Sequence, residues 1–347
     1  MISDLLPFGP GEQAVILAPK LREPLEVDFF CFSRGDRCGP TSASTGEWYE
    51  YEIGKRNWIG ALRYLHRCLR KNRYDLVHTW DRRSTDLVRW ALLTAGRSAR
   101  SAVWIEQLED TPSKGVLRAI PGFPNPRATF AETWLAATAQ RVEVLALPLA
   151  VPCPLQNKSF RSTLDLPPDV KLIGTVCPLE ARHGLKHLIW CLDQLKCVRA
   201  DVRLAIWGTG SQATPLRRYA RHVGVDDWIF WMDSKRDVRS EMSSLDLYWH
   251  APRSVSTPSA LVAALLLGLP TIAPTFAATR DLCSTWPTIL KTVAWGARDE
   301  ISRQTHQWLE NGLPTTDGAS AAAWCESHSP SAIAQEYARA YTRLLRA

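Results

Sequence analysis

The chain has 347 residues, 46% hydrophobic and 22% charged, which fits two globular domains of roughly 150–180 residues each and excludes a disordered chain. Lys and Arg outnumber Asp and Glu by 42 to 35, and the net charge of +7 favours anionic ligands such as nucleotides or phospholipid headgroups. The nine cysteines are widely spaced without a Cys-x-x-Cys pair, so we expect neither a disulfide framework nor a metal site, but a reducing, cytoplasmic setting.

The first half of the chain is expected to alternate strands and helices. Its opening residues have neither a basic nor an apolar segment, so no signal peptide is predicted. Residues 55–73 are basic, and Trp58, Leu62, Leu65 and Leu69 recur there at helical spacing. This helix either packs its apolar stripe on a sheet or lies on an acidic membrane surface, and we favour packing. Strands are predicted at 26–32, 76–79, 102–105 and 142–147.

A proline-rich segment, 148–168, is the natural hinge, so we divide the chain into domains at 1–150 and 151–347. The apolar run at 260–278 is broken by glycine and proline and reads as a buried helix followed by a buried strand. An amphipathic helix over 331–347 closes the second domain. Strands are predicted in this domain at 171–176, 201–207, 228–231, 247–250 and 271–273, with helices between them.

Short strands that alternate with helices are typical of a parallel, doubly wound sheet. The sequence therefore predicts an α/β protein with two Rossmann-like domains that face a cleft. Ligands of such sheets bind beyond the carboxyl ends of the strands, which makes the cleft the default site.

The second half resembles the family 4 glycosyltransferases, retaining enzymes of the GT-B fold that transfer a sugar from a nucleotide donor. Residues 172–283 carry the resemblance. The matching segments are Ile173-Gly-Thr-Val176, Leu204–Gly210, Asp246-Leu-Tyr-Trp-His-Ala-Pro252, Pro258-x-Ala260-Leu261 and Gly268-Leu-Pro270. The resemblance implies a nucleotide-sugar donor, linked to UDP or GDP, and hexosyl transfer without a further cofactor.

The first half resembles the acceptor domain of the family more loosely. Residues 4–13 look like its opening strand and glycine-rich turn, which would place Gly9 and Gly11 at the donor. Pro10 stands where the family has the second glycine of this turn, and it has no N–H to offer. Only about six residues precede the turn, so either the start codon is misplaced or the sheet has a stunted central strand.

The donor site implied by the resemblance has lost its charged side chains. The family uses an Arg and a Lys against the diphosphate and two glutamates against the ribose and the sugar. Pro178 and His183 occupy the basic positions, and Val255 and Ala263 occupy the acidic ones. The donor site is therefore predicted to be degenerate.

Some donor-binding features remain. Thr257 and Pro258 form a helix start whose free N–H groups favour a phosphate. Gly208 and Gly210 leave room for close backbone approach, while Arg182 and Arg253 could supply displaced positive charge. His183 could replace the lysine when protonated, although an ordinary histidine is mostly neutral at pH 7.

His78 and Asp81 lie at the end of a predicted strand and are candidate catalytic residues. A histidine at a strand end is as often a structural hydrogen-bonding residue, so both interpretations stay open for His78.

Two functions compete. The first is an active retaining hexosyltransferase with relocated charges, and the second is an inactive pseudoglycosyltransferase that binds a nucleotide sugar or a protein partner. A sugar-nucleotide epimerase would need its own carboxylates, which we do not find. The scattered tryptophans form no nucleic-acid signature, so nucleic acid is not an expected partner. The sequence leaves the base, sugar, acceptor and oligomeric state open.

Overall fold

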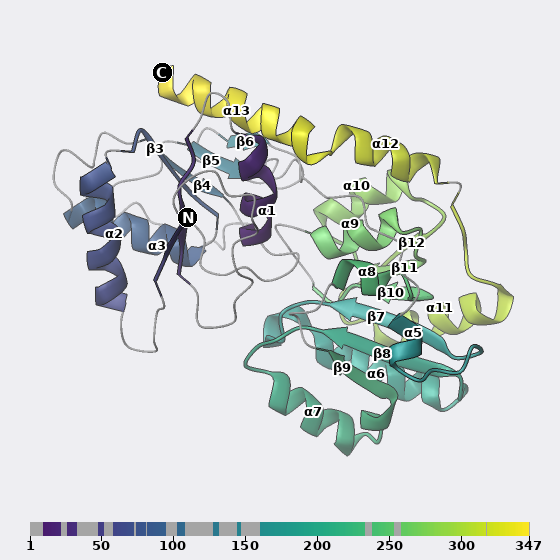
Figure 1. The fold of residues 1–347 in the computed structure, drawn as a ribbon. Helices are drawn as coiled ribbons and strands as arrows, with labels where there is room; N and C mark the ends of the chain where they lie inside the picture. The colour runs from purple at the N-terminus through teal and green to yellow at the C-terminus, as the bar shows by residue number, and fades with distance from the viewer. Residues whose placement is uncertain are drawn as a thin grey trace. The chain divides into compact units, whose positions relative to one another are not determined.

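The computed structural model describes most of the chain and divides it into two compact units. The first unit is Met1–Ala150 with Ser327–Ala347, and the second is Val151–Glu326 (Figure 1). The sequence assigns the last helix to the second domain, whereas the structure groups it with the first unit. The described residues are 10–21, 26–32, 48–51, 58–72, 74–80, 82–94, 103–107, 128–131, 144–146, 160–232, 238–252, 258–316 and 318–346.

The second unit is built on a six-stranded sheet in which every neighbouring pair is parallel. The order is β12-β11-β10-β7-β8-β9, so the direction of winding reverses between β7 and β10. This confirms the doubly wound sheet predicted for the second half. The strands are β7 (Lys171–Val176), β8 (Val202–Trp207), β9 (Ile229–Met232), β10 (Leu247–Trp249), β11 (Thr271–Pro274) and β12 (Leu290–Val293).

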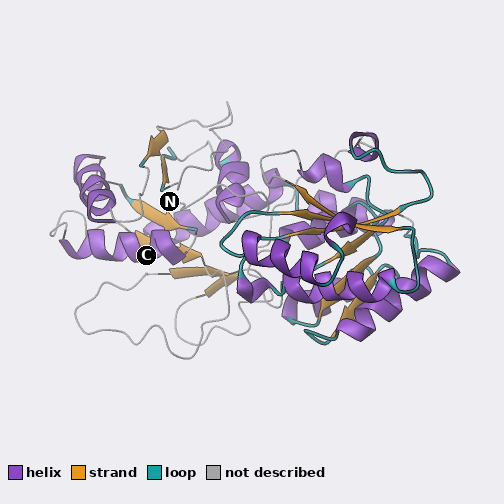
Figure 2. Ribbon diagram, turned by 90° about the horizontal axis from the view of Figure 1, so that it is seen from below, coloured by secondary structure: helices purple, strands orange, loops and turns teal. Residues whose placement is uncertain are grey.

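Helices cover both faces of this sheet (Figure 2). The apolar run at 260–278 is, as predicted, a buried helix followed by a buried strand. No helix among the described residues is long and apolar enough to cross a membrane. The helices are α5 (Phe160–Thr163), η2 (Ala181–His183), α6 (Leu185–Lys196), α7 (Ala213–His222), η3 (Asp226–Trp228), α8 (Val238–Met242), α9 (Ser259–Leu266), α10 (Ala277–Thr285), α11 (Arg298–Asn311) and α12 (Ala319–Ser327).

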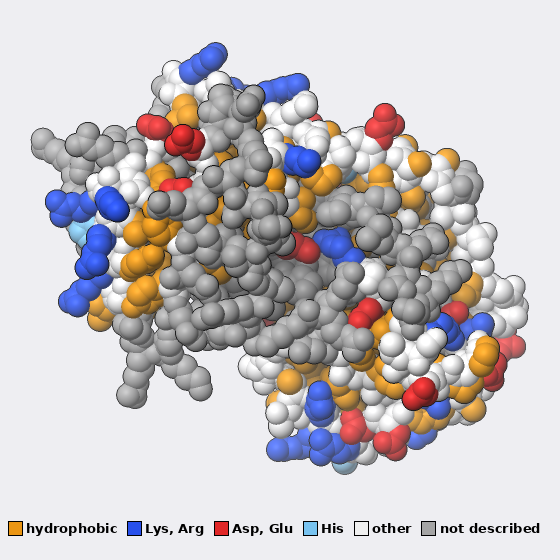
Figure 3. Space-filling view, in the orientation of Figure 1, with side chains coloured by type: hydrophobic (Ala, Val, Ile, Leu, Met, Phe, Trp, Pro, Cys, Tyr) orange, Lys and Arg blue, Asp and Glu red, His pale blue; other side chains and the backbone are white. Residues whose placement is uncertain are grey.

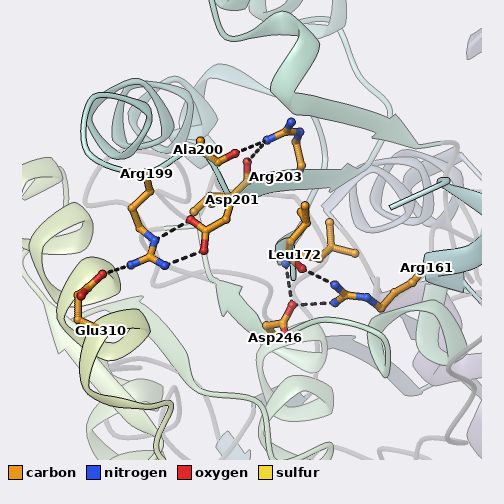
Figure 4. A network of polar contacts seen from close by, with 10 residues as sticks. Arg161, Leu172, Arg199, Ala200, Asp201, Arg203, Asp246 and Glu310 are labelled. Atoms are coloured by element: carbon orange, nitrogen blue, oxygen red, sulfur yellow. Dashed lines mark hydrogen bonds and ion pairs between the residues drawn. The ribbon is translucent and has the colours of Figure 1, made fainter. Parts of the chain in front are cut away.

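A charged network joins the amino ends of the two central strands (Figure 4). Asp246 Oδ2 accepts a hydrogen bond from the Leu172 N–H at 2.7 Å and another from Arg161 Nη1 at 2.8 Å. Arg161 also donates to the Val170 carbonyl. Because β7 begins at Lys171 and β10 at Leu247, the network ties α5 to both strands beside the point where the sheet order reverses.

A second network lies at the same edge of the sheet (Figure 4). The Arg199 guanidinium pairs with Asp201, at 2.6 Å between Nη2 and Oδ2, and with Glu310 near the end of α11. The hydrogen bond from Arg199 holds the pKa of the Asp201 carboxyl below its ordinary value. The two networks together gather paired charges at the amino ends of the strands.

The first unit contains two separate parallel sheets in its described residues. Residues 4–9, where the opening strand is predicted, lie outside the described residues, and no described strand joins the two sheets. The strands are β1 (Phe29–Cys31) and β2 (Trp48–Glu50) in one sheet, and β3 (Leu76–Thr79), β4 (Val103–Gln107), β5 (Ala128–Ala131) and β6 (Val144–Ala146) in the other. The helices of this unit are α1 (Pro10–Leu17), η1 (Ala18–Lys20), α2 (Trp58–Asn72), α3 (Arg82–Thr94) and α13 (Pro330–Arg346).

The predicted glycine-rich turn continues directly into helix α1. Pro10 is its first residue, a position where a missing N–H removes no helical hydrogen bond, and Gly11 is its second. Gly9 lies outside the described residues. Gly11 is therefore a buried helical residue.

The apolar stripe of α2 packs inward along most of its length. Leu65 and Leu69 are buried in a cluster with β1, β3 and α3, and Leu62 is partly buried against it. Trp58, the first residue of the stripe, remains 52% exposed. The stripe is thus mainly a core feature, as favoured from the sequence, but its first residue faces solvent.

We predict that Asp246→Ala lowers the free energy of unfolding by about 2–3 kcal/mol, because it leaves the Leu172 N–H and the Arg161 guanidinium without their shared acceptor. Chemical denaturation followed by circular dichroism measures this difference. Asp227→Ala, which removes an exposed carboxylate from η3, is the matched control. Equal stability of the two variants would show that the network contributes nothing to the pairing of β7 and β10.

Candidate functional site in the second unit

The candidate site of the second unit lies at the carboxyl ends of β7 and β10. Open parallel sheets bind ligands where the strand order reverses, and these two strands form that point here. The segment after β7 runs from Cys177 through η2 to Gly184, and the segment after β10 begins at His250. Two segments far apart in sequence therefore meet at one edge of the sheet.

Gly208 and Gly210 allow two loops to pack against each other. A Cβ on Gly208 would lie 2.0 Å from the Cys177 carbonyl oxygen, and one on Gly210 would lie 2.5 Å from the Leu179 carbonyl oxygen. The Leu179 N–H donates to the Thr209 carbonyl at 2.8 Å, which joins the loops. The space next to both glycines is thus filled by the loop that follows β7, so their first role is structural.

His183 and Arg182 are neighbours with opposite surroundings. His183 ends η2 with only 6% of its surface exposed, and Gly184 follows in the left-handed conformation at φ 72°. The Arg182 side chain is largely exposed and lies 3.5 Å from Glu180 Oε2. The structure therefore places the imidazole in the interior and leaves the guanidinium at the surface, beside a carboxylate.

His250 is the residue that sequence reasoning missed. It is 4% exposed, and neither ring nitrogen has a hydrogen-bond partner among the described residues. Its ring lies 6.2 Å from that of Tyr248 and 6.1 Å from that of Phe276, between centroids. Burial lowers the pKa of His250 to about 3, and the charge of His183 contributes in the same direction. His250 is therefore a neutral, buried imidazole at the centre of the site.

The start of α9 differs by one residue from the predicted start. Pro258 occupies the cap position and Ser259 is the first helical residue, whereas the sequence places Pro258 inside the helix. The Ser259 hydroxyl is fully buried and has no described hydrogen-bond partner. Thr257, Arg253 and Val255 lie outside the described residues. Ala263 is fully buried within α9.

One carboxylate among the described residues of this unit is buried. Glu241 of α8 accepts a hydrogen bond from Trp207 Nε1 at 2.7 Å, at the end of β8. The described residues contain no group of three or more His, Cys, Asp or Glu side chains arranged to hold a metal ion.

Of the two candidate catalytic residues of the first unit, the structure describes only His78. His78 in β3 is buried, and its Nδ1 lies 2.7 Å from the Tyr341 hydroxyl of α13. Its ring stacks on Trp80 at 4.4 Å between centroids, and Tyr337 lies against both rings. This geometry favours the structural interpretation of His78, because the imidazole anchors the last helix to its sheet. Asp81 lies outside the described residues.

Residues 170–311 match the family model described as glycosyl transferases group 1. In fold, the chain is similar to Anabaena Alr3699/HepE in complex with UDP-glucose, with a TM-score of 0.75 and 15% identity over 99% of this chain and 98% of that chain. It is similar to the sucrose-phosphate synthase of Thermosynechococcus elongatus, with a TM-score of 0.73 and 14% identity over 95% and 92% of the two chains. WaaG, a glycosyltransferase involved in lipopolysaccharide biosynthesis, has a TM-score of 0.70 and 14% identity over 99% and 100%. No curated protein sequence matches the chain.

The chain is therefore a glycosyltransferase-like protein with the GT-B fold. Its residues 170–311, less than half of the chain, match the model of the group 1 glycosyl transferases. Both statements confirm the family resemblance that residues 172–283 carry in the sequence.

The depressed pKa of His250 predicts a pH-dependent stability. The unfolded chain protonates this imidazole near pH 6.5 and the folded chain only near pH 3, so the unfolded state binds more protons between these values. The contribution of neutral His250 is complete above about pH 6.5 and decreases as the pH falls, by up to about 1.4 kcal/mol per pH unit.

Denaturation of the wild type and of His250→Asn at about pH 7 and pH 5 measures this effect. We expect the wild type to lose more stability than the variant. His222→Asn, on the exposed end of α7, is the control and should follow the wild type. Parallel pH dependence of His250→Asn and the wild type would contradict the assignment.

Proposed function

We propose that the protein binds a UDP- or GDP-linked sugar at the carboxyl edge of the second sheet and transfers its hexosyl group slowly. The observation that carries the proposal is the meeting of the loop after β7 with the end of β10, where the imidazoles of His183 and His250 are both buried. The complex of Alr3699/HepE with UDP-glucose supports a donor of this class.

Retention of the sugar's anomeric configuration follows from the resemblance to retaining enzymes and belongs to the same proposal. A departing nucleoside diphosphate develops negative charge, which a transferase stabilises with donors and cations aimed at it. Here His183 stands where the family has its lysine, and Pro178, which cannot carry charge, stands where it has its arginine. The donor site is thus degenerate in charge, although its backbone frame remains.

The lost charges are expected to affect donor binding less than the rate of transfer. One lost hydrogen bond to a charged group weakens binding by about 1.5–3 kcal/mol, or roughly 10- to 150-fold. Two lost stabilisers of the transition state, at about 2.7–4 kcal/mol each, slow the reaction on the order of 10⁴-fold or more. Donor binding therefore survives these replacements much better than catalysis does.

A second candidate function is a pseudoglycosyltransferase that binds the donor or a protein partner without turnover. The observation that favours it is the exposure of Arg182 beside Glu180, since this arginine is not buried next to His183. Turnover measurements on the donor-bound protein distinguish the two candidates.

We predict that calorimetry detects binding of UDP-glucose or a GDP-linked hexose, with a kcat far below the value of about 10 s⁻¹ common among enzymes. Val255→Glu, which restores the first carboxylate of the family, should tighten binding by about 10- to 150-fold. Val198→Glu places a carboxylate on an exposed valine of the same unit and is the matched control.

Binding without any turnover would favour the pseudoglycosyltransferase. A kcat in the ordinary range would contradict the proposed loss of electrostatic stabilisation. Absence of binding to every nucleotide sugar would contradict the proposed function as a whole.

For the first unit, we propose peripheral contact of α2 with the acidic inner face of a membrane, from a cytoplasmic location. Figure 3 shows Lys and Arg side chains gathered over α2, and Trp58 and Ile59 at its start are 52% and 48% exposed. The exposed basic residues of this helix are Arg63, Arg67, Arg70 and Lys71. A basic helix with exposed apolar residues at one end suits an anionic lipid surface.

Sedimentation with phosphatidylglycerol vesicles tests this contact, with phosphatidylcholine vesicles as the uncharged comparison. The double variant Trp58→Ser with Ile59→Ser should bind about tenfold less, because two apolar side chains no longer enter the interface. Trp90→Ser removes an exposed tryptophan from α3 and is the matched control. Equal binding to both lipids would contradict the contact.

A further inference from the structure

His183 and His250, which we call the switch-point histidines, approach each other from two different loops. His183 ends η2 after β7, and His250 follows directly on β10. They are close enough for the charge of His183 to act on His250, and each exposes less than a tenth of its surface. The central pair of strands in the sheet thus brings two imidazoles into one buried place.

His250 lacks the hydrogen-bond partner that a structural histidine in a protein core has. His78 shows the ordinary case in this protein, since its Nδ1 meets the Tyr341 hydroxyl at 2.7 Å. Both nitrogens of His250 are instead without a described partner, although nearly all buried polar groups in proteins have one. A ligand that supplies an oxygen at this point would satisfy the ring.

Two further titratable groups of the described chain lie at the ends of β7 and β10, and both are neutral. Tyr248 lies on the strand that precedes His250, and Cys177 at the end of β7 interacts with Tyr248. Burial raises the pKa of both groups, so the hydroxyl and the thiol stay protonated. The ring of Phe276, the residue before α10, lies against His250 and cannot titrate.

The buried carboxylate of α8 is engaged elsewhere. Glu241 accepts from Trp207 Nε1 at the end of β8, and no charge of Glu241 acts on His250. Ser259, the first residue of α9, carries a neutral hydroxyl. Among the described residues, only the charge of His183 acts on His250, and it opposes protonation.

We propose that the switch-point histidines bind the diphosphate of the donor. Their positive charge comes from one proton that the pair takes up when the donor binds. This inference rests on the proposed function, because it concerns the same site. A ring nitrogen accepts one proton from solvent as the diphosphate arrives, and no bond of the donor breaks. Proton uptake thereby replaces the permanent cations that the family places at Pro178 and His183.

Binding must then depend on pH. If one proton enters with each donor, affinity changes by up to about tenfold per pH unit and is greater at lower pH. An arginine or lysine site would instead keep its charge throughout this range. The pH dependence therefore distinguishes proton uptake from a fixed charge.

The probe is UDP-glucose, because its diphosphate is esterified at both ends and has no proton to gain or lose near neutral pH. Calorimetry at about pH 6 and about pH 8, in two buffers of different ionisation enthalpy, counts the protons bound with the ligand. We expect an affinity about 10- to 100-fold higher at the lower pH and net uptake of about one proton.

His250→Asn keeps a polar side chain without a titrating group, and His183→Asn does the same on the other loop. Both should lose most of the pH dependence, whereas His222→Asn at the exposed end of α7 should keep it. Thermal unfolding of each variant establishes that it is folded, and the proton count on the wild type needs no variant.

Binding by the wild type with equal affinity at both pH values and no proton uptake would overturn this inference and leave the proposed function intact. Full pH dependence in both folded histidine variants would also overturn it. Absence of UDP-glucose binding at either pH would overturn the proposed function for this donor, and the inference with it.

Discussion

The parallel pairing of β7 with β10 is the constraint on which the second unit depends. These strands are neighbours in the sheet although their register partners Ile173 and Leu247 are far apart in the sequence, and the winding reverses between them. Their carboxyl ends must therefore release two chain segments at one place. The Asp246 carboxylate, bonded to the Leu172 N–H and to Arg161, joins the same two strands at the opposite edge.

The two edges of this sheet differ in where their charged and titratable side chains lie. The amino edge holds Arg161, Arg199 and their carboxylate partners in ion pairs. The carboxyl edge places histidines in the interior and leaves Arg182 exposed. A buried imidazole is neutral or charged depending on what lies beside it, whereas a guanidinium keeps its charge. The two ends of the same strands thus differ in how they place their charged and titratable side chains.

Much of the architecture was predictable because most strands and helices have a local signal, although strands β2, β5 and β12 were not predicted. Short apolar runs broken by glycine or proline predicted the alternation of strands and helices. The loop after β7 packs against Gly208 and Gly210, and their expected role at the donor stays a prediction. The start of α9 was misplaced by one residue, since a proline can occupy either the cap or the first helical turn. The last helix was assigned to the wrong unit for a different reason: its apolar face is visible in the sequence, but its partners near His78 are not.

The sequence alone determined the α/β class and the family resemblance of residues 172–283. These are properties of residue order, spacing and side-chain type. Only the tertiary structure decided that His78 bonds to Tyr341, that His183 is buried beside an exposed Arg182, and that His250 stands near His183 without a described partner. Such facts depend on which distant segments share an interior, and burial and pairing set the protonation of a side chain more strongly than its neighbours along the chain do.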